Sequence, residues 1–321
     1  MNAMPSRTVR IARKTVEAQD ICSFELVDPD GRSLPHFTAG AHVDVHLSDG
    51  LVRQYSLCND PAETHRYLIA VLREPTSRGG SAGMHGLAEG TLLTIGEPRN
   101  HFPLADAATH HLLLAGGIGV TPMLSMAAQL VRSDASFDLH YCTRSRARAA
   151  FADRIEGSAF APLATLHFDD GAASQKLDLA TRLQQSAPGT HLYVCGPSGF
   201  MDWVLATART AGWADERLHR EYFNAAPVDA SADGAFEVQI ASTGQVIPIA
   251  ADQSVVAALA EHGIEIPVSC EQGVCGTCLT RVREGTPLHR DVFLTPAEQA
   301  LGDQFTPCCS RATSARLVLD L

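Results

Sequence analysis

The chain has 321 residues, of which 45% are hydrophobic and 19% charged, and its formal net charge at pH 7 is −11. This length suits two to three domains, and the acidic charge argues against nucleic acid or an anionic membrane as a partner. No apolar run reaches the roughly 20 residues of a transmembrane helix. The first residues, MNAMPSRTVRIARKTVEA, lack the apolar stretch of a secretory signal, so a cytoplasmic protein is expected.

The first third of the chain, from Thr8 to about Leu104, contains short segments with β-strand character. AHVDVHL alternates apolar and polar residues by two, as a half-buried strand does, and RYLIAVLRE and TLLTIGEP are two more candidates. Because several short strands precede any long helix, this region is predicted to form a small antiparallel β-barrel.

After this region the pattern changes to alternating strands and helices. HHLLLAGG has the composition of a buried strand that runs into glycine, and PMLSMAAQLVRS has helical spacing. FDLHYCTRS, ATLHFDD and HLYVCGPSG are further strand candidates, separated by helical stretches. This alternation predicts a parallel, doubly wound sheet.

A polar stretch, NAAPVDASADGA, runs from Asn224 to Ala235 and has the composition of a linker. Beyond it, FEVQIAST and QVIPIAA are expected to form a hairpin about Gly244. A short helix follows in SVVAALAEHG, where Ser254 is placed to cap its start and Gly263 to end it.

Nine cysteines occur in the chain, and five of them follow residue 269. Cys270, Cys275 and Cys278 have the C-x4-C-x2-C spacing of a plant-type 2Fe–2S cluster, and thiolates are soft ligands that suit iron–sulfur. Two intervening glycines allow the sharp turns such a loop needs. The alternatives are a zinc site, whose cysteines usually come in two pairs, or idle thiols. Cys308 and Cys309 are both candidates for the fourth ligand, and only one can face the cluster from extended backbone.

A second motif, LLLAGGIGVTPM at residues 112–123, joins a buried strand to a helix through a glycine-rich turn. Thr121 is expected to cap this helix and Pro122 to occupy its first position, which would aim the positive helix end at a pyrophosphate. An ordinary strand-to-helix turn is the competing interpretation. VCGPSGFM, at residues 194–201, favours the ligand site, because it places a second such turn on the same edge of the sheet.

A third motif lies in the barrel region. RQYSLCN begins at Arg53, and VLREPTSRGGSAGMH follows from Val71. The second stretch supplies a small basic, glycine-rich anion site made of Arg73, Arg78, Gly79, Gly80 and Ser81. Together with the aromatic ring of Tyr55, such a phosphate site would suit flavin mononucleotide (FMN). Taken alone, the first stretch is equally compatible with an ordinary edge strand.

In this order the motifs resemble the phthalate dioxygenase reductase family, in the branch that includes vanillate O-demethylase reductases. RQYSL is similar to its flavin motif, GGIGVTPM and CGPSGFM to its nicotinamide motifs, and CEQGVCGTC, CCSRA and LVLDL to its C-terminal ferredoxin domain. The resemblance covers almost the whole chain. It implies an FMN-binding antiparallel β-barrel at residues 1–105, a doubly wound parallel α/β domain that binds nicotinamide dinucleotide at 106–226, and a β-grasp 2Fe–2S ferredoxin domain at 227–321.

The resemblance also implies the site residues. Flavin contacts are expected from Arg53, Gln54, Tyr55, Ser56, Ala70, Val71, Arg73, Arg78, Gly79, Gly80 and Ser81. Within this set Tyr55 would pack on the ring and Ser56 would hydrogen-bond near its reacting nitrogen. Nicotinamide contacts are expected from Gly117, Thr121, Cys195, Gly196 and Pro197, with Phe223 as the aromatic residue near the flavin that the nicotinamide displaces. The cluster ligands would be Cys270, Cys275, Cys278 and Cys308, since the family's last ligand lies two residues before a Ser-Arg pair.

Two observations favour different nicotinamide cofactors. The second strand of the parallel sheet is followed by Arg144, Arg146 and Arg148 in CTRSRAR, where an acidic residue would be expected to bind the ribose of NADH. Arginines there favour the 2′-phosphate of NADPH, whereas the resemblance favours NADH. We expect NADH, with NADPH as the alternative.

The implied function is that of a reductase component. It would take a hydride from NADH onto FMN and pass single electrons through the 2Fe–2S cluster to a Rieske-type oxygenase acting on an aromatic acid or a similar small molecule. Cofactors carry this chemistry, so no side chain is expected to act as an essential acid, base or nucleophile. We expect a monomer. The alternative functions are a stand-alone redox-sensing module that binds flavin and iron–sulfur, and a zinc-stabilised binding protein.

Overall fold

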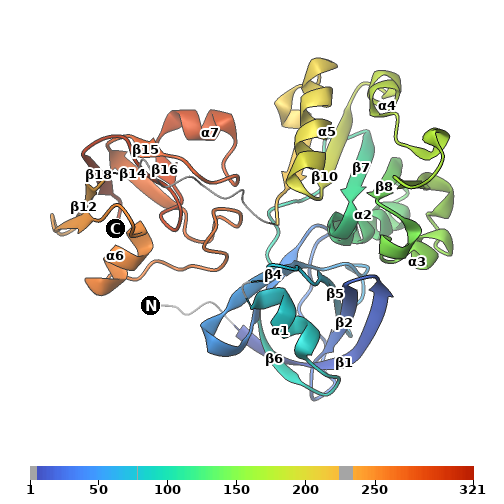
Figure 1. Ribbon diagram of the computed structural model, residues 1–321, viewed down its shortest axis with the longest axis horizontal. Helices are drawn as coiled ribbons and strands as arrows, with labels where there is room; N and C mark the ends of the chain where they lie inside the picture. The colour runs from blue at the N-terminus through green and yellow to red at the C-terminus, as the bar shows by residue number, and fades with distance from the viewer. Residues whose placement is uncertain (1–5, 78, 224–233) are drawn as a thin grey trace. The chain divides into compact units, whose positions relative to one another are not determined.

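The computed structural model describes residues 6–77, 79–223 and 234–321 (Figure 1). The chain divides into two compact units, Met1–Glu221 and Tyr222–Leu321. Most of the predicted linker, and Arg78 of the predicted anion site, lie outside the described residues. None of the described helices has the length and apolar character needed to cross a bilayer.

The first unit begins with the predicted antiparallel barrel. Its six strands hydrogen-bond in the order β4-β3-β6-β1-β2-β5, and the outermost strands β4 and β5 also contact each other. The strands are β1 (Ser6–Ala18), β2 (Ile21–Val27), β3 (His42–His46), β4 (Val52–Ser56), β5 (Tyr67–Leu72) and β6 (Leu92–Gly96). All of their pairings are antiparallel, so the prediction of this architecture is confirmed. A single short α-helix, α1 (Gly80–Gly86), lies between β5 and β6.

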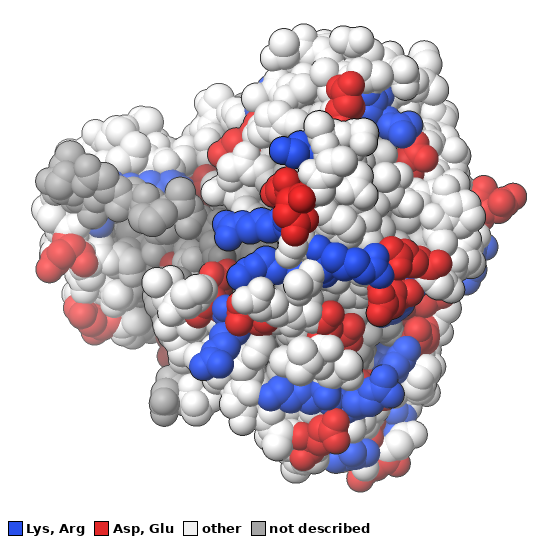
Figure 2. Space-filling view, turned by 45° about the vertical axis from the view of Figure 1, so that its right-hand side comes forward, with Lys and Arg blue, Asp and Glu red and all other residues white. Residues whose placement is uncertain are grey.

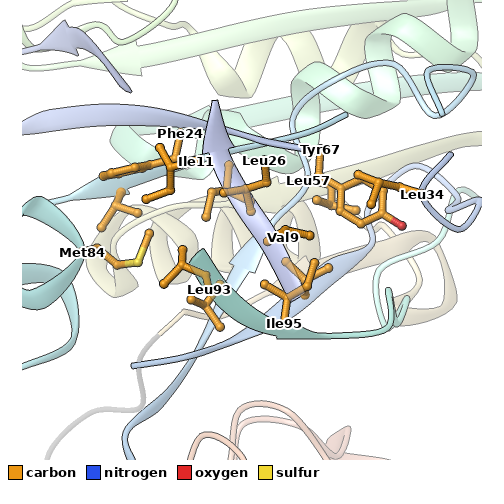
Figure 3. Close-up of a cluster of buried hydrophobic side chains, with 14 of the residues drawn as sticks. Val9, Ile11, Phe24, Leu26, Leu34, Leu57, Tyr67, Met84, Leu93 and Ile95 are labelled. Atoms are coloured by element: carbon orange, nitrogen blue, oxygen red, sulfur yellow. The ribbon is translucent and has the colours of Figure 1, made fainter. Parts of the chain in front are cut away.

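Alternate residues of the barrel strands fill its core (Figure 3). Val9 and Ile11 of β1 and Phe24 and Leu26 of β2 are all fully buried, because side chains two residues apart point to the same face of a strand. Burial of each such side chain contributes about 1.5–3 kcal/mol relative to exposure. Met84 of α1 joins this core and anchors the helix against the barrel.

The rest of the first unit is a five-stranded parallel sheet in the order β11-β10-β7-β8-β9. The strands are β7 (His110–Gly116), β8 (Phe137–Thr143), β9 (Ala164–Phe168), β10 (Thr190–Cys195) and β11 (Leu218–Glu221). The helices between them are α2 (Val120–Arg132), α3 (Ala152–Glu156), α4 (Leu179–Gln185) and α5 (Ser198–Thr210). The chain moves outward from β7 to β9 and then returns to β10 on the other side, so the topological switch point lies between β7 and β10.

Short 3-10 turns occur in both the barrel and the parallel-sheet part of this unit. They are η1 (Ser48–Gly50), η2 (Gly117–Gly119), η3 (Arg146–Arg148), η4 (Ala161–Leu163), η5 (Ala173–Gln175) and η6 (Asp215–Arg217). η2 corrects the sequence prediction for the following helix. Because it continues directly into α2, the helix begins at Val120 with Gly119 as its N-cap, and Thr121 and Pro122 both fall inside the first turn.

The barrel and the parallel sheet are tied together within the first unit. Arg154 of α3 donates a hydrogen bond from Nη2 to the Cys58 carbonyl oxygen over 3.3 Å. The backbone N–H of Ala39 donates to Oε1 of Gln129 on α2 over 3.2 Å. A Cβ on Gly40 would overlap the Phe102 carbonyl, so this close approach requires glycine.

The second unit contains a mixed sheet in the order β13-β12-β18-β14-β16 and a two-stranded sheet of β15 and β17. The strands are β12 (Phe236–Ile240), β13 (Val246–Ile249), β14 (Thr280–Glu284), β15 (Pro287–Leu288), β16 (Gln304–Phe305), β17 (Arg311–Ala312) and β18 (Arg316–Leu319). The helices are α6 (Val255–Glu261) and α7 (Pro296–Leu301). The predicted hairpin is confirmed, since β12 and β13 pair antiparallel about Gly244 at φ 74°. Ser254 caps α6 by accepting from the N–H of Ala257.

Candidate functional site

Three residues of the predicted anion site, Gly79, Gly80 and Ser81, lie where the loop after β5 meets β4. Gly79 adopts φ 92°, a left-handed conformation that favours glycine, as it enters α1. A Cβ on Gly80 would lie 2.7 Å from Nε of Arg53, so the arginine of β4 packs directly against this turn. Ser81 accepts a hydrogen bond at Oγ from the N–H of Glu74 over 3.1 Å, which closes the loop. The structure therefore brings one cation, two glycines and a serine to one place.

The other predicted flavin residues of β5 and its loop are arranged differently. The side chain of Val71 is buried in the barrel core, and its carbonyl oxygen lies 2.9 Å from Nε2 of His85. Ala70, its neighbour on the strand, is also buried. Arg73 is exposed, and its N–H donates to the Asp20 carbonyl over 2.7 Å. Any flavin contact from Val71 would thus come from its backbone.

The middle of β4 presents Gln54 and Tyr55. The Tyr55 ring is half-buried against the barrel core, and this burial raises the pKa of its hydroxyl well above the ordinary range. Gln54 donates from Nε2 to Oδ1 of buried Asp44 over 3.2 Å and lies 3.3 Å from Nε2 of His42. Asp44 also accepts from Arg99 Nη2 over 2.6 Å. The Gln54 side chain is therefore held in one orientation.

At the end of β4, Ser56 meets a residue that sequence reasoning missed. Ser56 Oγ donates to Oε2 of Glu221 over 3.2 Å, although 165 positions separate the two residues. Glu221 ends β11, in register with Cys195 of β10, so the barrel and the parallel sheet meet here. Burial raises the pKa of the Glu221 carboxyl to about 8, and the Ser56 hydrogen bond opposes that rise. Burial therefore favours the protonated form of this carboxyl, which lies beside the predicted flavin-contacting hydroxyl.

The two predicted nicotinamide turns lie in contact with each other. They leave β7 and β10, the neighbouring strands on either side of the switch point, where ligands of such sheets bind. A Cβ on Gly119 would overlap the Cys195 carbonyl, and a Cβ on Gly196, at φ 157°, would lie 2.9 Å from Cα of Gly116. Pro197 is exposed at the start of α5. Only glycine allows these backbones to approach so closely.

Three further residues belong to the predicted nicotinamide and flavin set. Gly117, at φ 53°, is half-buried within the first turn. The buried Thr121 does not cap α2; its Oγ1 instead donates to the Ile118 carbonyl over 3.1 Å. Phe223 follows Glu221 by two residues and falls in the second unit, so its role beside the flavin stays a prediction.

One of the three arginines after β8 already has acidic partners. Arg146 is bound by two carboxylates, with Nη2 2.7 Å from Oδ1 of Asp153 and Nη1 2.5 Å from Oε1 of Glu156. Figure 2 shows the same interspersion of Lys and Arg with Asp and Glu over the face that it draws. Because the charge of Arg146 is already matched by two carboxylates, this residue is a poor candidate for the 2′-phosphate of NADPH.

The cysteine loop of the second unit brings four thiols together. The Cys308 thiol lies close enough to those of Cys270, Cys278 and Cys309 to raise its own pKa, and the Cys275 thiol interacts in the same way with that of Cys270. These contacts with Cys275 and Cys308 lower the pKa of Cys270. Among the described side chains, no three of His, Cys, Asp or Glu are arranged around one metal ion, whereas a 2Fe–2S cluster divides four thiolates between two irons.

The backbone of this loop also fits an anionic cluster. The N–H groups of Gln272 and Thr277 donate to Sγ of Cys270 and Cys275, each over 3.4 Å. Such N–H groups stabilise negative charge on ligand sulfurs. Gly276 adopts φ 67°, and a Cβ there would overlap the ring of Phe293. The glycines predicted from the sequence are therefore required by the turn itself.

Cys309 occupies a different environment from Cys308. Its Sγ lies 3.3 Å from Oγ1 of Thr306 and 3.8 Å from Oγ of Ser310. A Cβ on Gly273 would lie 2.5 Å from this sulfur, so the thiol packs against the cysteine loop at Gly273. Among the described residues, Cys309 thus has hydroxyl partners that Cys308 lacks, and Cys308 is the one cysteine of this group that it contacts directly.

Comparisons with known proteins agree with this geometry. The family model described as a 2Fe-2S iron-sulfur cluster binding domain matches residues 238–313, and that of the Dimethylamine monooxygenase subunit DmmA-like N-terminal domain matches residues 98–218. The Vanillate O-demethylase oxidoreductase of Pseudomonas putida is 59% identical over 313 residues, which cover 97% of this chain and 98% of that protein.

Solved structures give the same result. A phthalate dioxygenase reductase, described as a modular structure for electron transfer from pyridine nucleotides to [2Fe–2S], matches with a TM-score of 0.74 and 40% identity over 98% of both chains. An intact type IV self-sufficient cytochrome P450 monooxygenase matches with a TM-score of 0.87 and 37% identity, over 98% of this chain and 41% of that longer one. These likenesses do not favour the redox-sensing alternative. The chain belongs to the family of the vanillate O-demethylase oxidoreductases and phthalate dioxygenase reductases, and is an electron-transfer oxidoreductase with a C-terminal 2Fe–2S domain.

Proposed function

We propose that this chain is the reductase component of a Rieske-type oxygenase system, fed by NADH through FMN and a 2Fe–2S cluster. The observation that carries the proposal is the pairing of two sites in one chain. One is the meeting of the barrel and the parallel-sheet turns at Ser56 and Glu221, and the other is the four-thiol group. Bound flavin would accept electrons in pairs and release them singly, which is what joins a hydride donor to a one-electron cluster.

The chain's own residues would bind and orient these groups. We assign the flavin contacts to Arg53, Gln54, Tyr55, Ser56, Ala70, Val71, Arg73, Arg78, Gly79, Gly80 and Ser81, and the nicotinamide contacts to Gly117, Thr121, Cys195, Gly196 and Pro197. Phe223 would be the aromatic residue near the flavin that the nicotinamide displaces. The packing of Arg53 against Gly80 supports the phosphate site, and the contact between the two glycine turns supports the nicotinamide site. The Glu221 carboxyl, held by Ser56, would keep a proton next to the flavin ring.

We assign the cluster to Cys270, Cys275, Cys278 and Cys308. The thiol contacts of Cys308 support this choice over Cys309. NADH is our preferred donor, supported by the two carboxylates that bind Arg146. The domain boundaries at residues 105 and 226 would separate the barrel, the parallel sheet and the ferredoxin domain.

The proposed partner is an oxygenase that acts on an aromatic acid or a similar small molecule, as the names of the vanillate and phthalate relatives suggest. The net charge of −11 would suit a basic docking face on that partner. We propose that the reductase is a monomer and works in the cytoplasm, where reducing conditions would keep its nine cysteines as thiols; all nine are free.

Separating the two sites tests the proposal. The fragment 1–226 should bind FMN and reduce ferricyanide with NADH, but it should lose the reduction of cytochrome c, which needs a one-electron exit through the cluster. The full chain, as the matched control, should do both and should show flavin and iron–sulfur absorbance. A colourless full chain, or a fragment that still reduces cytochrome c at the full rate, would refute the assignment.

A further inference from the structure

A buried carboxylate lies beside the cysteine loop, in the segment between β15 and α7. The side chain of Asp291 is 0% exposed. Burial of a charged group is costly unless hydrogen bonds surround it, so a buried carboxylate in a domain this small calls for a specific reason.

Every hydrogen-bond partner of this carboxylate among the described residues is able to donate. Oδ2 accepts from the N–H of Leu294 over 2.7 Å. Oδ1 lies 3.5 Å from Oγ of Ser310, which donates, and 3.4 Å from Nδ1 of His289. An ionised carboxylate can only accept hydrogen bonds, so this set of donors fits the charged form.

The same residue packs against the loop that carries the proposed ligands. Gly273 lies between Cys270 and Cys275, and a Cβ there would be 2.9 Å from both Cα and Cβ of Asp291. The next N–H, that of Val292, donates to the Gly273 carbonyl over 3.1 Å. Because Ser310 follows Cys308 by two residues, Asp291 links the three-cysteine loop to the segment of the fourth cysteine.

The neighbouring imidazole does not cancel this charge. His289 Nε2 is buried and has no hydrogen-bond partner among the described residues. A doubly protonated ring would bury an N–H without an acceptor, which costs free energy. The arrangement that avoids this has Nδ1–H donating to Asp291 and a bare Nε2, and it leaves one net negative charge on the pair.

We propose that Asp291 is a positioning residue of the cluster loop whose buried negative charge also lowers the reduction potential of the cluster. The inference rests on the proposed assignment of a 2Fe–2S cluster to the four cysteines. An electron added next to a fixed, water-excluded anion is disfavoured, and nearby charge is one of the factors that set cluster potentials. A low potential keeps the reduced cluster a strong one-electron donor.

The test uses Asp291→Asn in the full chain, because an amide of the same size can still accept from the N–H of Leu294. Iron per chain and the visible spectrum should match wild type, while the midpoint potential of the cluster, from a redox titration followed by electron paramagnetic resonance, should become more positive. The matched control is Glu271→Gln, which removes the same charge from an exposed residue next to Cys270. Water screens that charge, so its effect should be smaller.

The outcomes separate this inference from the proposed function. A wild-type chain without iron would overturn the function itself. An iron-replete Asp291→Asn with the wild-type potential, or with a change no larger than that of Glu271→Gln, would overturn only the role of Asp291. If Asp291→Asn cannot hold iron, the same titration is made on Ser310→Ala. This variant keeps the charge of Asp291 but removes one hydrogen-bond donor to it. Its potential should become more negative, and an unchanged value would overturn the inference.

Discussion

Glu221→Gln should remove a pH-dependent part of the stability of the first unit. The Glu221 carboxyl is raised in pKa by burial, so the folded chain binds its proton more tightly than the unfolded chain does. The stability gained from that proton is fully present below about pH 4.5 and is lost as the pH rises through about 8. Glutamine keeps a hydrogen-bonding group for Ser56 but carries no titrating proton.

The size of the effect follows from the structure. A pKa of about 8 against the ordinary 4.5 is a difference of about 3.5 pH units, and each unit corresponds to about 1.4 kcal/mol. The Glu221 side chain is 14% exposed, so water reduces the full value to roughly 3–4 kcal/mol. For a unit of about this size, each kcal/mol changes the melting temperature by about 2–4 °C, so a change on the order of 10 °C is expected.

Thermal unfolding of the flavin-free full chain at pH 5 and pH 9 measures this effect. Both tryptophans, Trp203 and Trp213, lie in the first unit, so their fluorescence reports on that unit alone. Wild type should lose roughly 10 °C more than Glu221→Gln between the two pH values. The control Glu216→Gln changes an exposed carboxyl and should behave as wild type. Equal losses in wild type and Glu221→Gln would refute the reasoning.

Four further substitutions test the three assigned sites. Cys308→Ala should lose iron and the charge-transfer absorbance whereas Cys309→Ala keeps both, since only Cys308 meets two other loop thiols; the reverse pattern would make Cys309 the ligand. Gly80→Ala should weaken FMN binding at least about tenfold in a fluorescence titration, because its Cβ would lie 2.7 Å from Nε of Arg53; unchanged affinity would move the phosphate elsewhere. Gly119→Ala should raise the Kd for NADH by a similar factor while FMN and iron remain bound, and an unaltered Kd would contradict the nicotinamide site.

Local patterns in the sequence were sufficient for most of the fold. Alternation by two located strands such as β3, and the change to strand–helix alternation located the parallel sheet. The spacing of Cys270, Cys275 and Cys278 predicted a thiol group that the structure brings together. Each of these features depends on residues that are close together in the chain, so its spacing can be read directly from the sequence.

What escaped prediction depends on contacts between distant segments or on local geometry that the sequence leaves open. The Ser56–Glu221 hydrogen bond spans 165 positions, and nothing near either residue marks it except that Glu221 lies two residues before Phe223. Asp291 resembled any other loop carboxylate until its burial was known. The capping role of Thr121 was wrong because the 3-10 turn before it leads straight into α2, and no residue pattern signals that continuation.

The boundary at residue 221 bears on how such chains can be recombined in evolution or in the laboratory. The contact between Ser56 and Glu221 lies wholly before it, and the group made by Cys270, Cys275, Cys278 and Cys308 lies wholly after it. Each of these contacts joins side chains of one unit only. A gene segment for the iron–sulfur unit that begins after Phe223 could therefore be moved to the opposite end of the chain, or exchanged for another one-electron carrier, without rebuilding the hydride-accepting half.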